Sequence, residues 1–251
     1  MILSEGVPDI AELFNFSPGF LGFSYAVYAM AVAFVIVSAF MLLAFRGAPK
    51  PVPGRLAMLG ESIVGFVRSG IAEEVIGHDG ARYLPYLTTL FLLILGFNLM
   101  EIFPGVSFPP SSKIAVPMFL AIVSYLVFNF EGIRTQGPGK YFKEILFPPG
   151  VPWPFYVLLT PIELLSILVI RPVTLTLRLT FNMVAGHLIL SLLAVLAGSM
   201  FIASPKVLAL PLVIGFGAVM TGFEIFVAFL QAFIFTVLTA LYIGGAVHPE
   251  H

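Results

Sequence analysis

The chain has no cysteine, which excludes disulfide bonds, cysteine-ligated zinc and thiol catalysis. Charge is also scarce: Asp, Glu, Lys and Arg make up 10% of its 251 residues, against about 25% in a soluble domain. The net charge of -1 leaves no basic surplus with which to bind nucleic acid. The first twelve residues contain acids but no Lys or Arg, so we expect no ordinary secretory signal peptide.

The chain is rich in long hydrophobic segments. Hydrophobic residues form 59% of it, its mean hydropathy is +1.06, and long apolar runs recur. Because about 20 apolar helical residues cross the hydrocarbon core, this composition predicts an all-α integral membrane protein. No internal repeat or low-complexity segment is found, so we expect a single membrane domain over 1–251.

Five membrane-embedded helices and one interfacial helix are expected. The predicted spans are 23–45, 83–103 and 114–130, followed by a long tilted hairpin of 154–200 and 207–246. Segment 53–77 repeats apolar and charged residues at helical spacing, which indicates an amphipathic interfacial helix, with a soluble linker helix as the alternative. Basic residues follow the first and third spans, whereas segment 1–22 has none. We therefore expect the N-terminus outside and the C-terminus in the cytoplasm of a bacterial plasma membrane, or else an organelle inner membrane.

Each arm of the hairpin is longer than one crossing requires. Forty helical residues extend about 60 Å, and the hydrocarbon core is about 30 Å thick. Pro172 offers a break in the first arm, whereas the second has no proline between Pro211 and Pro249, which favours one inclined helix. Three glycines of the second arm suit close approach by other helices: Gly215, Gly217 and Gly222.

The hairpin carries a small set of polar side chains within its apolar length. They are Glu163, Arg171, Thr174, Arg178, Asn182, His187, Glu224 and Gln231. At 100° per residue, those from 171 to 182 share roughly one face and His187 lies on the opposite face. If the arms fold antiparallel about 204–205, facing residue numbers sum to about 409, so Arg178 lies opposite Gln231 and His187 near Glu224. Since Glu224 and Gln231 share a face, both contacts require a bend, a tilt or an intervening water.

These polar groups have structural as well as functional interpretations. Arg171 can extend to the interface, and a His187–Glu224 pair can hold two helices together or relay protons near neutral pH. Arg178 differs, because no acid of the return arm lies at its level. A cation in hydrocarbon costs about 2.5–3.5 kcal/mol on insertion scales and is by default a functional-site candidate. We therefore expect its counter-ion to belong to another polypeptide.

Two motifs then resemble one known family. The segment RPVTLTLRLTFNMVAGH (171–187), with EIFVAFLQAFIFTVLTALY (224–242) downstream, is similar to the paired signature of subunit a of F-type ATP synthases. NLMEIFPG (98–105) extends the resemblance, which covers most of the chain from about residue 80. It implies a static, non-catalytic subunit that translocates protons beside a ring of c subunits. The b-subunit peripheral stalk, the remaining synthase subunits and membrane lipid are its other implied partners.

The resemblance also assigns roles to residues and implies no cofactor or metal. Arg178 matches the essential arginine, which attracts a deprotonated ring carboxylate and separates two aqueous half-channels. Four residues match positions along the outer half-channel or near the arginine: Asn182, His187, Glu224 and Gln231. The acid and the histidine stand in exchanged order relative to some members. Asn98 and Glu101 match the outer mouth. Glu163 resembles an acid linked to the inner exit, although its spacing to Arg171 is one residue longer than in some relatives.

A self-contained proton- or ion-coupled secondary transporter is the alternative function. Transporters often have inverted repeats and broken helices near the midplane, whereas this chain has no repeat and a proline-free final arm. A membrane enzyme is disfavoured, because the sequence contains no nucleophile–base motif and no metal-ligand cluster. The choice between proton and sodium lies largely in the ring's own site.

Overall fold

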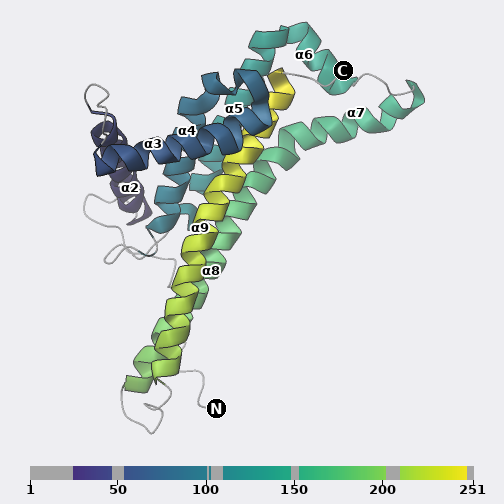
Figure 1. Ribbon diagram of the computed structural model, residues 1–251. Helices are drawn as coiled ribbons and strands as arrows, with labels where there is room; N and C mark the ends of the chain where they lie inside the picture. Colours follow the sequence, from purple (N-terminus) through teal and green to yellow (C-terminus); the bar gives the residue numbers. More distant parts are fainter. Residues whose placement is uncertain are drawn as a thin grey trace.

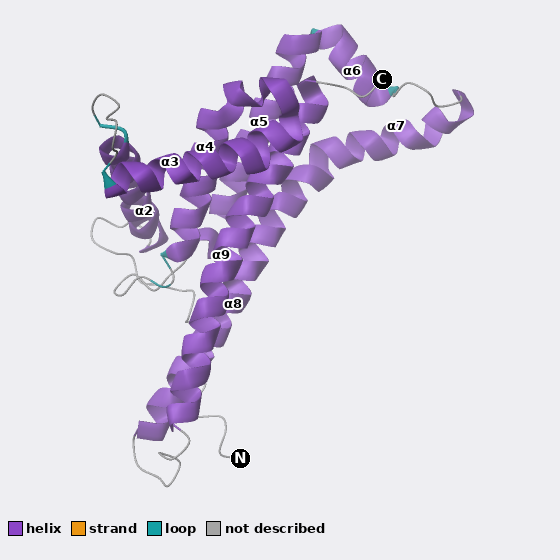
Figure 2. Ribbon diagram, viewed as in Figure 1, coloured by secondary structure: helices purple, strands orange, loops and turns teal. Residues whose placement is uncertain are grey.

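A computed structural model describes residues 25–46, 54–100, 102, 110–147, 153–201 and 210–247. All regular structure in these ranges is helical (Figure 2), which confirms the predicted all-α class. Five helical stretches among the described residues are long and apolar enough to cross a membrane, so the chain is an integral membrane protein. The expected outer segment 1–22 and the hairpin turn 203–206 lie outside the described residues.

The N-terminal half pairs two apolar helices through a helical arm. α2 (Tyr25–Ala44) is apolar throughout, and α3 (Arg55–Val67) begins the arm. The arm continues as a π-helical segment, Arg68–Ile76, and turns at Gly77, whose φ of 80° favours glycine. α4 (Gly80–Leu99) then packs against both α2 and the arm.

Helix boundaries differ from expectation in several places, and α4 begins at Gly80 rather than at residue 83. Within the expected interfacial segment, Arg55–Val67 is α-helical, but Arg68–Ile76 consists of π-helical turns, which a simple periodic pattern does not predict. α5 (Ala115–Gln136) extends past its expected end at 130, and a further helix, α6 (Pro138–Leu146), follows where no helix was expected. Gly137, with a φ of 83°, turns the chain between α5 and α6.

The C-terminal half forms the long hairpin. α7 (Tyr156–Leu165) joins α8 (Arg171–Phe201) through a π-helical segment, Ser166–Ile170. This break falls just before Pro172, as the sequence indicated, because proline cannot donate to the preceding turn. α7 consequently runs away from the bundle while α8 and α9 lie side by side (Figure 1). α9 (Leu210–Val247) is one continuous helix of 38 residues, as the absence of proline after Pro211 predicted.

The packed core lies where α4, α5 and α9 meet the helical arm. Its fully buried side chains include Val67, Ile71, Leu87, Ile94 and Ile243. Phenylalanines of the arm, α4 and α9 extend this core, with ring centroids 5.7–5.8 Å apart: Phe66, Phe91, Phe229 and Phe233. Among the described residues, α9 has none buried before Glu224, and the hairpin extends beyond the other helices there (Figure 1). Glu224 thus lies where the core ends and the extended part of the hairpin begins.

Candidate functional site in the hairpin

A hydrogen bond between the described parts of α8 and α9 shows the register of the hairpin. Gln231 on α9 is 3% exposed, and its Nε2 donates to the backbone carbonyl of Arg178 on α8 at 2.9 Å. This contact confirms the pairing expected from residue numbers that sum to about 409. The partner is the main chain of Arg178 rather than its side chain. The earlier conflict between faces therefore disappears, since the guanidinium need not point at α9.

The side chain of Arg178 lies on the exposed face of α8. Thr174 and Asn182, one turn before and one turn after it, are exposed on the same face. Within the described part of the chain, the guanidinium makes no ion pair and no hydrogen bond. Thr174 is satisfied locally, because its Oγ1 donates to the carbonyl of Ile170 at 2.7 Å. The cation of Arg178 is thus presented outward from an apolar helix.

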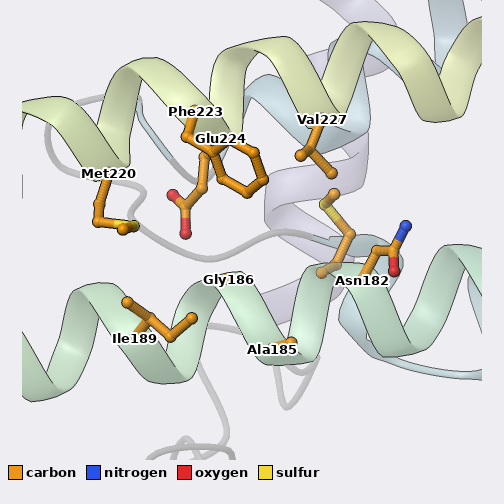
Figure 3. A pocket seen from close by; sticks show the side chains of 9 residues that line it. Asn182, Ala185, Gly186, Ile189, Met220, Phe223, Glu224 and Val227 are labelled. Atoms are coloured by element: carbon orange, nitrogen blue, oxygen red, sulfur yellow. The ribbon is translucent and has the colours of Figure 1, made fainter.

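Glu224 and His187 lie at one level of the hairpin, farther along α8 than Arg178. Both are buried, with 9% and 8% of their surface exposed. Glu224 points from α9 toward Gly186 on α8 (Figure 3), where a Cβ would stand only 2.7 Å from its Oε1. Glycine at this position therefore leaves the room that the carboxylate occupies. His187 follows Gly186 directly, so the predicted acid and histidine lie at the same level of the hairpin.

A cavity of about 310 Å³ opens between α8 and α9 beside this carboxylate (Figure 3). Its lining is Asn182, Met183, Ala185, Gly186, Ile189, Met220, Phe223, Glu224 and Val227. Asn182 and Glu224 supply its polar side chains, and the volume is ample for several waters. The cavity therefore connects Glu224 with the helix face that also bears Arg178.

Asn98 approaches the same region from α4. It is 1% exposed, and its Nδ2 donates to the carbonyl of Ala228 at 3.4 Å. Ala228 is one helical turn from Glu224, so the amide lies close to the acid's level on α9. Among the described residues, Asn98 Oδ1 has no hydrogen-bond partner. Glu101, predicted beside it, lies outside the described residues.

Glu163 and Arg171 form a second polar group at the other end of α8. Arg171 Nη2 lies 3.3 Å from Glu163 Oε1, and both side chains are about one-third exposed, at 28% and 34%. The guanidinium also lies over the ring of Tyr242 on α9, 5.0 Å from its centroid. Unlike Arg178, Arg171 therefore has partners within its own chain, which supports its structural interpretation.

The π-helical segment Ser166–Ile170 explains how Glu163 reaches Arg171. Residues eight apart on an α-helix point about 80° away from each other, whereas residues seven apart differ by about 20°. A π-helical turn takes in one additional residue. The pair therefore faces one way despite the longer spacing noted in the sequence. Such turns recur at functional sites in helices.

Several residues of the site were missed or misjudged from the sequence. Tyr242 and Gly186 were not singled out. Gly186 could have been, because facing residues of the hairpin have numbers that sum to about 409, which places Gly186 almost opposite Glu224. The three glycines expected at helix contacts do not make them: a Cβ at any of these positions would meet no described atom within 4 Å. They are Gly215, Gly217 and Gly222. All three lie before Glu224 on the part of α9 that extends beyond the bundle, so no other helix of the bundle reaches them.

The fold and this site define a class of protein, namely an all-α integral membrane protein that holds ionisable and amide groups inside a helical hairpin. No cluster of potential metal ligands occurs in the described part of the chain. The family model of the ATP synthase A chain matches residues 27–244. The chain therefore belongs to the ATP synthase A chain family.

Individual relatives agree with this assignment. ATP synthase subunit a of Frankia alni is 44% identical over 221 residues, which cover 87% of this chain and 76% of the relative. The Parafrankia sp. protein of the same name is 44% identical over 247 residues, covering 96% and 83%. The protein so named in Rhodococcus erythropolis is 40% identical over 220 residues, covering 86% and 79%.

Proposed function

We propose that this chain is the static, proton-conducting subunit in the membrane sector of a bacterial ATP synthase, and that it works against a ring of c subunits. Family membership and the five candidate spans support the membrane role. The observation that carries the mechanism is the guanidinium of Arg178. It is exposed on an apolar helix and, among the described residues, has no ion-pair partner. A carboxylate on a neighbouring, moving subunit is the counter-ion that such a group lacks.

Arg178 must attract each ring carboxylate and then release it. At 4 Å, two opposite charges attract by about 1 kcal/mol in water and about 4 kcal/mol at an effective dielectric of 20. The guanidinium is exposed, and Asn182, one helical turn from it, lines a cavity large enough for water, which suits the weaker end of this range. The same positive charge repels a proton, so it separates the two access routes that meet at the ring.

The remaining polar groups are proposed to form those two routes. The outer route passes Asn98 and Glu101 and reaches Glu224 and Asn182 at the cavity, with His187 at the same level of the hairpin. The inner route leaves past Glu163 at the start of the hairpin. Gln231 holds the hairpin in register at the level where the routes meet. One charge that crosses 100 mV releases about 2.3 kcal/mol, so a ring must sum several such steps for each ATP.

Partners and orientation follow from the same proposal. The b-subunit peripheral stalk would hold this chain stationary while the ring turns. Basic residues after the first and third spans support an orientation with those loops in the cytoplasm, the N-terminus outside and the C-terminus inside. A self-contained transporter remains the second candidate, and its distinguishing property is ion flux without any ring.

The test is Arg178→Ala in the assembled synthase in inverted membrane vesicles. We expect ATP-driven proton pumping to disappear. The ring carboxylates would lose their counter-charge, and the outer and inner proton routes would no longer be separated. Arg55→Ala is the matched control, since Arg55 is an exposed arginine on the helical arm, far along the chain from the hairpin. Normal pumping by Arg178→Ala would refute the assigned role. Proton flux through vesicles that contain this chain alone would instead favour the transporter.

A second test exchanges the acid and the histidine. His187→Glu and Glu224→His should each reduce pumping, because each removes one member of the buried group. The double exchange restores one acid and one histidine at the same level of the hairpin, so it should retain more activity than either single variant. A double variant no better than the singles would show that the two residues do not act together.

A further inference from the structure

α6 is a short helix with two unlike faces, and its inner face is fastened to α5. Tyr141 is 4% exposed, and its hydroxyl donates to Oδ1 of Asn129 at 3.0 Å. The Tyr141 ring fills the space beside Gly132, where any Cβ would collide with it. The orientation of α6 against α5 is therefore well determined, and so is the direction of its other face.

The outer face of α6 combines aromatic and basic side chains. Phe142 is 52% exposed, Phe147 just beyond the helix is 49% exposed, and Lys140 and Lys143, on either side of Phe142, are exposed as well. Arg134, at the end of α5, adds a cation that is 60% exposed, although its Nη1 also lies 3.8 Å from Oε1 of Glu131. A helix with lysines flanking large apolar side chains has the composition of a membrane-surface helix.

The position of α6 beside α7 supports the same placement. α7 exposes apolar side chains around most of its circumference, including Val157 at 76% and Leu158 at 68%, so it requires a hydrocarbon environment. Thr160 of α7 donates to the carbonyl of Leu146, the last residue of α6, at 2.6 Å. α6 packs against α7 and lies at the end of the bundle where α9 ends (Figure 1). A polar-edged helix bonded to a lipid-embedded helix lies at the boundary of the lipid.

We propose that the outer face of α6 binds the surface of the bilayer and selects anionic phospholipid. Phe142 and Phe147 enter the headgroup region, and the cations of Lys140, Lys143 and Arg134 gather phosphate-bearing lipids of negative net charge. Charge complementarity carries this choice of partner, because Glu144 is the single acid within α6. The contact also restrains α7, through the hydrogen bond between Thr160 and Leu146.

Fluorescence quenching by brominated lipids tests the proposal on the full chain in vesicles. The single tryptophan is first replaced, Trp153→Phe, and a new one is introduced as Phe142→Trp. Quenching is compared between vesicles in which either the anionic or the neutral lipid carries bromine at the same chain depth. The control is Phe34→Trp on α2, which is similarly exposed, at 56%, on a helix without charged residues.

We expect the anionic-to-neutral quenching ratio at position 142 to exceed the ratio at position 34 by about threefold or more. Lys140→Gln combined with Lys143→Gln should return it to the value at position 34. Equal ratios at both positions, or no quenching by either lipid at position 142, would overturn the proposal. In the assembled synthase, a photoreactive side chain at position 142 should form lipid adducts. An adduct to another subunit would likewise overturn it.

Discussion

The fit between Gly186 and Glu224 makes a sharp prediction for Gly186→Ala. The added methyl would stand 2.7 Å from Oε1 and 3.3 Å from Cδ of Glu224, whereas ordinary contacts begin near 3.4 Å. The carboxylate must therefore withdraw by roughly 0.7 Å or more. Bending a side chain away from its rotamer costs about 0.5–1.5 kcal/mol. Alanine is about 1 kcal/mol more favourable than glycine inside a helix. This gain offsets the cost of moving the Glu224 side chain, so the free energy of unfolding should hardly change.

Function should respond much more strongly than stability. Misplacement of a reacting group by about 1 Å can cost about 100-fold in rate, and we expect ATP-driven proton pumping to fall at least about tenfold. The assay compares pumping and thermal unfolding of the purified synthase that carries Gly186→Ala. Gly198→Ala on the same helix is the control, because no described atom lies within 4 Å of its Cβ. Unchanged pumping by the Gly186 variant would refute the idea that the position of this carboxylate matters.

Two further predictions concern single hydrogen bonds. Gln231→Leu leaves the carbonyl of Arg178 without its partner across the hairpin, so we expect a loss of about 1 kcal/mol in unfolding free energy together with weaker pumping. An unchanged unfolding temperature would contradict that role. Burial, together with the neighbouring Tyr125, raises the pKa of Tyr141 to about 12 from its ordinary 10.0, although Arg171 opposes the shift. The folded state thus holds this proton more tightly, and its stabilisation, complete below pH 10, is lost as the pH rises toward 12. A tryptophan at position 142 in neutral vesicles should report α6 detaching over that range. Tyr141→Phe should abolish the transition, and its persistence would exclude the tyrosine as the cause.

The register of the hairpin illustrates how far the sequence alone could lead. Residue numbering about a proline-containing turn placed Arg178 opposite Gln231, and the observed hydrogen bond joins the two residues. The same rule brought Glu224 to the level of His187. These expectations succeeded because, in an antiparallel pair of uninterrupted helices, the position of the turn determines which residues lie at the same level. The continuous α9 succeeded for a similar reason, since nothing in its composition interrupts the backbone ladder.

Other features depend on contacts that no local pattern contains. α6 was not expected, because its nine residues are too few to be helical alone, and it is held by Tyr141, Asn129 and Gly132. The glycines at 215–222 were assigned to helix contacts, but α9 extends beyond the bundle there. Glycine permits close approach without requiring it, so composition could not identify which glycines meet a neighbour.

The sequence by itself determined that this protein is an all-α membrane protein, because the length and purity of its apolar runs leave the backbone no other arrangement in lipid. It also indicated which few residues are candidates for the chemistry, since a polar group in hydrocarbon is costly whichever way its helix faces. Only the tertiary structure decided the surroundings of those residues. Arg171 is engaged by Glu163 and Tyr242, whereas Arg178 is turned outward. The two arginines are seven residues apart on one helix and nearly alike in direction. Their surroundings differ because a π-helical segment precedes Arg171, whereas Arg178 lies on an exposed face of α8. Both features depend on packing between segments that are distant in the sequence.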